Sequence, residues 1–342
     1  MTILTRFQGN AAIITLNRPE RYNATNLEII YKISQFLAEC ATNNKVEKII
    51  ITSNHPKAFC AGGDIKAAYD AMENNNLSLG SVFFNAEYKL VHELATYSKP
   101  IISLVNGLCF GGGMGLSMHN RYRIITENAI LGMPETIIGF FPDVGASFRF
   151  SQFPKSWAKF YGLTGNNIAI SHALKWNMAD YFISSSALPE LVNALCATNQ
   201  LDQVIEQFNQ PTPNEIIFGE NWVDNVFSLD LEHAFACLKT HMHPEAKKTF
   251  NDLNSRSPLS LRVTEKLLET STSINLSQAL RRDYIIAMNF LITSDFKEGI
   301  RAQVVDKDKN PKWHYTFDNT SSEMIDRFFQ PNHCSELVNN RN

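Results

Sequence analysis

The chain has 342 residues, of which 44% are hydrophobic and 19% are charged, and its formal net charge is -3 at pH 7. This composition is typical of a globular protein with one large domain and an appendage, or with two domains. The near-neutral charge gives no electrostatic reason to expect nucleic acid, and no apolar stretch reaches the roughly 20 residues of a membrane helix. We therefore expect no nucleic-acid or membrane partner.

Short β-branched runs alternate with helical patterns in the first half of the chain. The runs predict strands at residues 13–17, 48–52, 100–107 and 123–126. The middle two are apolar throughout, as buried strands are. Because the first run follows directly on residues that already alternate like a strand, no signal or transit peptide is visible at the start of the sequence.

A helix is predicted between the first two strands. The segment NLEIIYKISQFLAEC, residues 26–40, places apolar residues at helical spacing, and Thr25 or Asn26 can cap its start. Strand, helix and strand in this order indicate an α/β fold with parallel strand pairing.

Helical patterns dominate after about residue 150. The clearest are residues 276–293 and 295–307, and the prolines and asparagines of 210–222 predict an irregular connection. We expect an α/β core over residues 1–250 and a helical C-terminal region over residues 251–342.

The six cysteines are scattered, without C-x-x-C or paired Cys/His spacing. We therefore expect neither a structural zinc site nor a disulfide framework, and we predict a reducing, cytoplasmic location.

Two glycine-rich loops each follow a predicted strand and lead into a helical pattern. The first contains Ala61-Gly62-Gly63-Asp64, and the second is GGGMG at residues 111–115. Neither has the spacing of a nucleotide-binding loop. Each loop is either a tight turn or a source of exposed N–H groups at a helix start. Two such loops can together bind a developing oxyanion, as acyl chemistry requires.

Two carboxylates occupy the apolar stretch MPETIIGFFPDVG, residues 133–145. They are Glu135 and Asp143. An ionised carboxylate is costly to bury without a partner, so the stretch is either a surface turn or the lining of a site.

The motifs AFCAGGDI, GLCFGGGMGLS and MPETIIGFFPDVG, in this order, resemble those of the crotonase (enoyl-CoA hydratase/isomerase) superfamily. The chain is similar in particular to its 3-hydroxyisobutyryl-CoA hydrolase subgroup. The features shared with this subgroup are the FPDVG sequence after PET, FF-x-x-EY at 83–88, SPLSL at 257–261, DFKEGIRA at 295–302 and DKDKNPKW at 306–313. The resemblance spans residues 10–330 and implies a spiral of ββα units that binds acyl-CoA, with a helical C-terminal region that covers the pocket or mediates assembly.

The resemblance implies a role for each site residue. The backbone N–H groups of Ala61 and Gly112 would form the oxyanion hole, and Glu135 and Asp143 would be catalytic. Glu87, Gly112, Glu135 and Asp143 would bind the substrate. From the residues alone, Glu87 could equally face solvent on an amphipathic helix, and Asp143 could be a solvated turn acid. Whether Glu135 is a nucleophile or a general base stays open.

One position departs from the hydratase pattern. Hydratases carry a second glutamate two residues after the last glycine of GGG, where this chain has Gly115. Adding water across a double bond is served by two carboxylates, so Gly115 argues against efficient hydratase activity. The resemblance implies instead the hydrolysis of a short 3-hydroxyacyl-CoA, with 3-hydroxyisobutyryl-CoA of valine breakdown as the expected substrate. The alternatives are an enoyl-CoA hydratase or isomerase using Glu135, and a non-catalytic CoA-binding relative.

Other residues carry weaker signals. Arg18, Arg21, Lys57 and Lys66 lie near the motifs that would bind the CoA phosphates, although each can equally be a surface charge. His92, His119 and His172 show no partner spacing, and Trp313 is expected to serve packing. The subgroup requires no metal or redox cofactor, and family members include homo-oligomers, so assembly of this chain is left open.

Overall fold

A computed structural model describes residues 1–74, 76–213 and 220–331. The chain divides into two compact units, and it crosses from one to the other several times. Unit 1 contains Met1–Gly63, Ala86–Gly132 and Ile168–Glu215; unit 2 contains Asp64–Asn85, Met133–Asn167 and Ile216–Asn342. This division differs from the expected boundary at residue 250, because early segments of the chain pack with the C-terminal helices.

Unit 1 contains a six-stranded sheet in the order β1-β2-β3-β5-β7-β9. Only the β1–β2 pair is antiparallel, and the other neighbours are parallel. The bounds are β1 Ile3–Gln8, β2 Ala11–Leu16, β3 Lys48–Ser53, β5 Ile101–Val105, β7 Tyr122–Ile125 and β9 Tyr181–Phe182. The four predicted strands are confirmed as β2, β3, β5 and β7.

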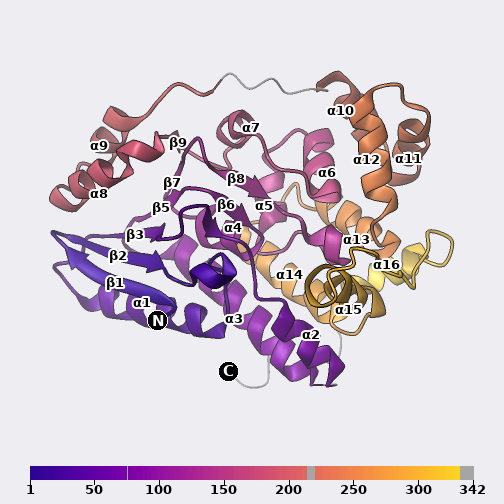
Figure 1. Ribbon diagram of the computed structural model, residues 1–342, viewed down its shortest axis with the longest axis horizontal. Coiled ribbons are helices and arrows are strands. Elements are labelled where there is room, and N and C mark those ends of the chain that lie inside the picture. Colours follow the sequence, from indigo (N-terminus) through magenta and orange to yellow (C-terminus); the bar gives the residue numbers. More distant parts are fainter. Residues whose placement is uncertain (75, 214–219, 332–342) are drawn as a thin grey trace. The chain divides into compact units, whose positions relative to one another are not determined.

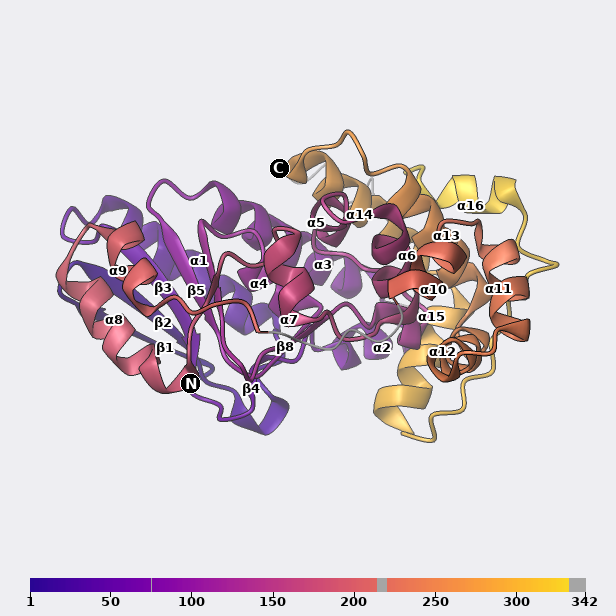
Figure 2. The ribbon, with the colours of Figure 1, turned by 90° about the horizontal axis from the view of Figure 1, so that it is seen from above.

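Helices cover both faces of this sheet, which explains why β2 and β5 are buried along their whole length. Figure 1 shows α8 (Leu188–Ala197) and α9 (Leu201–Phe208) on one side and α1 (Leu27–Thr42) on the other. Figure 2 shows α8 and α9 lying across the strands. The predicted helix is α1, and its cap is Asn26, whose side chain accepts the Ile29 N–H at 3.0 Å.

A second, three-stranded parallel sheet in unit 1 leads into both glycine-rich loops. Its order is β4-β6-β8, with bounds Ala58–Cys60, Leu108–Phe110 and Ile130–Gly132. The residues after β4 form the first loop, and those after β6 begin the short helix α4 (Gly112–Ser117). Unit 1 also contains η1 (Pro19–Arg21), η3 (Ser185–Ala187) and α7 (Ile170–Lys175), while α3 (Leu77–Thr96) begins in unit 2 and ends in unit 1.

Unit 2 is helical in the residues that the structure describes. Its helices are α2 Lys66–Glu73, η2 Glu135–Ile138, α5 Ala146–Phe150, α6 Lys155–Thr164, α10 Glu220–Phe227, α11 Leu231–Thr240, α12 Pro244–Asn254, α13 Pro258–Glu269, α14 Leu276–Phe290, α15 Ser294–Ile300, a π-helix at Arg301–Val305, and α16 Ser322–Phe328. The pattern at 276–293 is confirmed as α14. The pattern at 295–307 is confirmed as α15 continued by the π-helix. Residues 214–219 of the predicted connection at 210–222 lie outside the described residues.

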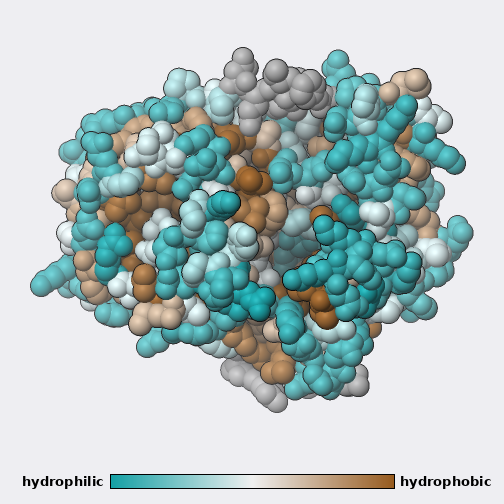
Figure 3. All heavy atoms as spheres, in the orientation of Figure 1, coloured by the Kyte–Doolittle hydropathy of each residue, from teal (hydrophilic) through white to brown (hydrophobic). Residues whose placement is uncertain are grey.

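Mainly hydrophilic residues cover α11 and α12 in the face shown by Figure 3, in agreement with the exposed charges of both helices. Within the described residues, no helix combines the length and apolar character needed to cross a bilayer.

Candidate active site

The two glycine-rich loops of unit 1 depend on glycine for their backbone. Gly62 has φ of 115° and Gly111 has φ of 47°, both in the region that side chains other than glycine rarely adopt. Gly111 directly precedes α4, so Gly112 is the first helical residue and its N–H has no carbonyl to bond within the helix. The loop therefore presents a backbone donor, as its sequence predicted.

The first loop presents a different donor from the one expected. The Ala61 N–H donates to the Tyr22 carbonyl at 3.0 Å, which argues against Ala61 as an oxyanion donor because this N–H is already bonded. Gly63 is placed better, since its nitrogen lies 3.2 Å from the position that a Cβ on Gly112 would occupy. The structure thus places the N–H groups of Gly63 and Gly112 next to each other, and the oxyanion pair is corrected accordingly.

Glu87 also lies at Gly112. A Cβ on Gly112 would be 2.5 Å from Glu87 Oε1 and 3.0 Å from Thr25 Oγ1. Glu87 is 5% exposed, so the alternative of a solvent-facing residue is wrong. Thr25 is fully enclosed as well, and its hydroxyl lies 3.1 Å from Glu87 Oε1, as a donor to that carboxylate. Sequence analysis considered Thr25 only as a helix cap and missed this contact.

A buried thiol lies beneath this group. Burial raises the pKa of Cys60 to about 12, and the nearby charge of Glu87 acts in the same direction. Cys60 is therefore a neutral packing residue at physiological pH, and its carbonyl lies under Gly113.

For the acyl-CoA chemistry that the sequence motifs imply, replacing Thr25 with valine is expected to lower kcat/KM about tenfold or more, because a hydrogen bond to a charged group contributes about 1.5–3 kcal/mol. Steady-state kinetics of Thr25→Val and of the matched Thr25→Ser, which keeps the hydroxyl, provide the measurement. A loss in Thr25→Ser with near wild-type kinetics in Thr25→Val, which keeps the side-chain volume, would show that the volume matters and the hydroxyl does not.

Glu135 begins the 3₁₀ helix η2 in unit 2. The helix follows Pro134 and ends at Gly139, whose φ of 67° turns the chain. The Phe140 N–H then bonds back to the Glu135 carbonyl at 3.0 Å. Glu135 itself is 8% exposed, so it sits inside the protein with only an edge open to solvent. Glu135 is therefore an enclosed carboxylate and not a solvated one.

Aromatic packing anchors the segment between the two acids. Phe140 stacks on Phe296 and Phe84, with ring centroids 4.4 and 5.4 Å away, and Phe141 stacks on Phe290 at 5.6 Å. The Phe140 carbonyl also accepts a hydrogen bond from the Ser260 hydroxyl. The apolar residues of this stretch thus fix its backbone in the core of unit 2. The fixed backbone in turn holds the two acids at defined positions.

Asp143 lies on a tight turn between these phenylalanines and α5. It is 5% exposed, so the alternative of a solvated turn acid is wrong. Its carbonyl accepts the Ala146 N–H at 2.8 Å, and the turn residues Val144 and Gly145 have φ of 50° and 77°. A left-handed valine is uncommon and strained, so other contacts must hold the turn.

The C-terminal part of unit 2 packs against the end of η2. A Cβ on Gly139 would lie 2.9 Å from the Asp295 carbonyl and 3.0 Å from the Trp313 ring. The Trp313 indole donates to the Ser255 carbonyl at 2.9 Å. These contacts agree with the packing role expected of Trp313.

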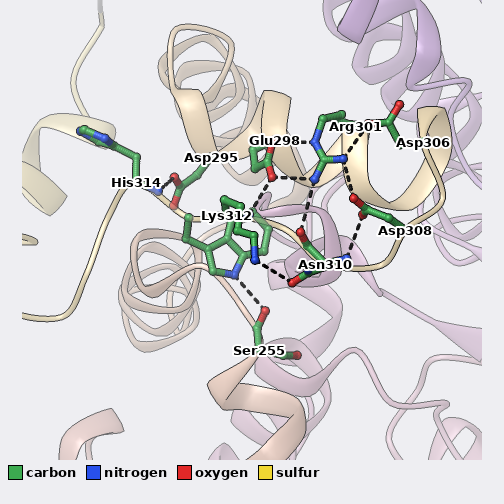
Figure 4. Close-up of polar contacts among 10 residues, drawn as sticks. Ser255, Asp295, Glu298, Arg301, Asp306, Asp308, Asn310, Lys312 and His314 are labelled. Atoms are coloured by element: carbon green, nitrogen blue, oxygen red, sulfur yellow. Dashed lines mark hydrogen bonds and ion pairs between the residues drawn. The ribbon is translucent and has the colours of Figure 1, made fainter.

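An ion-pair cluster holds the Trp313 segment in place. Arg301 binds Glu298 and Asp308 at 2.8 Å and Asp306 at 2.6 Å, as Figure 4 shows. Glu298 also accepts the Lys312 N–H at 2.6 Å. The acids of the DKDKNPKW motif, Asp306 and Asp308, therefore form ion pairs with Arg301 that stabilise this segment.

Gly115 is buried inside α4, so the position of the second hydratase glutamate offers no side chain. The other candidates are dispersed. Arg18 bonds to the Ala24 carbonyl, whereas Arg21, Lys57 and Lys66 are solvent-exposed. His92 is exposed and His119 is buried. The ring of His172 lies against Trp176 in a tilted arrangement, with centroids 4.0 Å apart.

The residues that carry the site thus fall into two described groups. Gly63, Gly112, Glu87 and Thr25 belong to unit 1, and Glu135 and Asp143 belong to unit 2. The first group combines backbone N–H donors with a carboxylate, and the second combines two enclosed carboxylates. Each group contains functional groups of the kind that acyl-CoA chemistry uses.

The chain belongs to the enoyl-CoA hydratase/isomerase family, whose model matches residues 11–329. Among solved structures, an enoyl-CoA hydratase from Rhodobacter sphaeroides is 30% identical with a TM-score of 0.88, covering 97% of this chain and 98% of that one. These matches confirm the predicted crotonase-like α/β fold with a helical C-terminal region.

Curated relatives of this chain include members of the predicted subgroup. The protein named 3-hydroxyisobutyryl-CoA hydrolase 1 of Arabidopsis thaliana is 33% identical, covering 96% of this chain and 91% of the relative. A Schizosaccharomyces pombe protein named small ribosomal subunit protein mS47 is also 33% identical, covering 96% of this chain and 80% of that protein. The resemblance to 3-hydroxyisobutyryl-CoA hydrolases is confirmed.

Proposed function

We propose that this chain hydrolyses the thioester of a short 3-hydroxyacyl-CoA, and that the substrate is 3-hydroxyisobutyryl-CoA, as in valine breakdown. The observation that carries the proposal is the enclosed pair Glu135 and Asp143, on one braced segment, combined with the absence of a side chain at Gly115. The names of relatives such as the Arabidopsis thaliana hydrolase support the choice of acyl group.

The N–H groups of Gly63 and Gly112 stabilise the oxyanion that forms from the thioester carbonyl. Glu135 acts by one of two routes. Its carboxylate attacks the acyl carbon, expels CoA as a thiolate, and leaves an anhydride for water to hydrolyse; or it takes a proton from the water that attacks. Both routes give a free 3-hydroxy acid and the CoA thiol. Asp143 accepts a hydrogen bond from the substrate 3-hydroxyl.

Hydration of an enoyl-CoA is the competing function, since the R. sphaeroides neighbour bears that name. Gly115 argues against it, because a syn addition of water needs one group for the water and another for the Cα proton. A non-catalytic role has support from the name of the S. pombe relative. The enclosed acids of this chain argue for catalysis, because an enclosed carboxylate without a function is a cost to stability.

Replacing Asp143 with asparagine tests the assigned contact with the substrate hydroxyl. We expect the wild type to hydrolyse 3-hydroxyisobutyryl-CoA at least about 100-fold better than isobutyryl-CoA, because a site built to bond a hydroxyl discriminates strongly against analogues that lack it. Asp143→Asn should lose most of this preference. Thiol release from both substrates gives the measurement, and Asp318→Asn, at an exposed position, is the control. An equal loss on both substrates would assign Asp143 to positioning water instead.

We also propose that hydrolysis needs no metal or redox cofactor, since carboxylates and water supply all the groups that thioester cleavage consumes. Prolonged dialysis against a chelator is expected to leave kcat unchanged. A loss of activity that is restored by a divalent cation would contradict this.

The remaining expectations are a cytoplasmic location and a capacity to form homo-oligomers. Support for a reducing compartment comes from Cys40, Cys60, Cys109, Cys196 and Cys237, which are all free thiols in the described part of the chain. Cell fractionation with an antibody, and light scattering of the purified protein, test the two proposals.

A further inference from the structure

A third carboxyl group lies beside the turn that carries Asp143. Asp283 is on α14, which packs against α5, and none of its surface is exposed. Its Oδ2 atom accepts the Gly145 N–H at 2.7 Å. Neither the sequence motifs nor the proposed chemistry assigned any role to this residue.

The turn needs this contact. Val144 and Gly145 both have left-handed backbones, and this conformation is strained for a β-branched residue. Among the hydrogen bonds that hold the turn are those from the Ala146 N–H to the Asp143 carbonyl and from the Gly145 N–H to Asp283. The second ties the turn to a neighbouring helix, so it fixes where Asp143 points.

Asp283 is uncharged in this environment. Its Oδ1 atom is buried and has no hydrogen-bond partner among the described residues, which suits a protonated carboxyl far better than an ionised one. The charged groups that act on it are Asp143, which opposes its ionisation, and Arg282, which favours it. Arg282 directs its hydrogen bonds elsewhere, to Ser147, Ser271 and the end of α13. Burial raises the pKa of Asp283 to about 8.

We propose that Asp283 is a positioning residue for Asp143: as a neutral acid it accepts the Gly145 N–H and holds the Val144–Gly145 turn, and its ionisation in alkaline solution inactivates the enzyme by placing a second negative charge beside Asp143. This inference rests on the proposed hydrolase function. An ionised Asp283 would place a second negative charge beside Asp143, and the repulsion would displace the carboxylate that binds the substrate hydroxyl.

The test compares wild type with Asp283→Asn and Asp283→Leu over about pH 6 to 9.5, a range that brackets the raised pKa. Asparagine keeps an oxygen for the Gly145 N–H and cannot ionise, whereas leucine removes the acceptor. We expect kcat/KM of the wild type to fall with a midpoint near pH 8, and this descending limb to be absent in Asp283→Asn. Asp283→Leu should lose about 100-fold or more in kcat at every pH.

Thermal unfolding gives a readout that does not depend on activity. Because the folded state holds the Asp283 proton up to about pH 8 while the unfolded chain releases it near its ordinary value of 3.8, wild-type stability should fall as pH rises between these values. Asp283→Asn has no carboxyl proton to release, so this loss of stability with rising pH should be absent. The Tm of the variant relative to that of the wild type should therefore rise toward pH 8.

The outcomes separate the two proposals. If the wild type releases no thiol, the hydrolase function fails, whatever the variants do. If it does release thiol, and Asp283→Asn keeps the same alkaline limb as the wild type, the positioning role is overturned. A lowered Tm in Asp283→Leu together with unchanged kinetics of the folded enzyme would likewise reduce Asp283 to a structural residue.

Discussion

Replacing Glu135 with glutamine is expected to lower kcat for thiol release by about 1,000-fold or more, because the neutral amide can neither attack the acyl carbon nor accept a proton from water. The side chains are nearly equal in size, so the packing around η2 should persist. The residue is 8% exposed, and removing an enclosed charge should leave Tm unchanged or slightly higher. Single-turnover and steady-state thiol release measure the effect.

The control for this variant is Glu323→Gln on α16, where the carboxylate is exposed and the same chemical change should have no effect on kcat. A Glu135→Gln enzyme that retains more than about a tenth of wild-type kcat would remove Glu135 from the chemical step, since general acid–base catalysis alone is worth about 10²–10⁴-fold.

Replacing Gly112 with alanine is expected to lower kcat/KM about 100-fold, with a larger loss for valine. The backbone N–H remains, but the added Cβ would hold the thioester carbonyl away from it, and losing one oxyanion contact costs about 10²–10³-fold. The added Cβ would lie 2.5 Å from Glu87 Oε1 and 3.2 Å from the Gly63 nitrogen, in the space beside both donors. The Glu87 carboxylate is the end of a flexible side chain and can move aside, so the fold should survive. Kinetics and Tm should be measured together.

Gly113→Ala provides the matched comparison one residue further along α4. Its Cβ would lie 2.4 Å from the Cys60 carbonyl, which is backbone and cannot move cheaply. This variant should lose about 1–3 kcal/mol of stability, while Gly112→Ala should lose activity at nearly constant Tm. If Gly112→Ala loses stability to the same extent as Gly113→Ala, then Gly112 is needed only for close packing.

The sequence predicted strands and helices well where the spacing of the apolar residues is enough to tell one from the other. The parallel strands and α1 follow directly from apolar runs and helical spacing, and the two glycine-rich loops lie where strand ends and helix starts were expected. The choice between Thr25 and Asn26 as the helix cap was left open, because both side chains can accept an N–H. The structure uses Asn26 for the cap, which leaves the Thr25 hydroxyl for Glu87.

Contacts between distant segments were harder to predict. Nothing in the local pattern shows that the Ala61 N–H meets the Tyr22 carbonyl, so the wrong residue of the loop was chosen as donor. Glu87 has the spacing of a surface residue, and only the fold encloses it. Asp283 belongs to an ordinary amphipathic helix, and its role depends on a turn that is far away in the sequence.

The division into units was unpredictable for the same reason. Helical patterns after residue 150 suggested a C-terminal boundary, yet residues 64–85 and 133–167 pack with the C-terminal helices. The apolar stretch at 133–145 needs these helices to bury Phe140 and Phe141. The segment that contains Glu135 and Asp143 is thus stabilised by helices from the end of the chain.

The most direct test of the hydrolase function measures two reactions of the wild-type protein side by side: thiol release from 3-hydroxyisobutyryl-CoA and hydration of crotonyl-CoA. With Glu135 and Asp143 enclosed and no side chain at Gly115, we expect rapid thiol release and negligible hydration. Efficient hydration without thiol release would contradict the hydrolase function and would show that Glu135 performs hydration without a second glutamate at position 115.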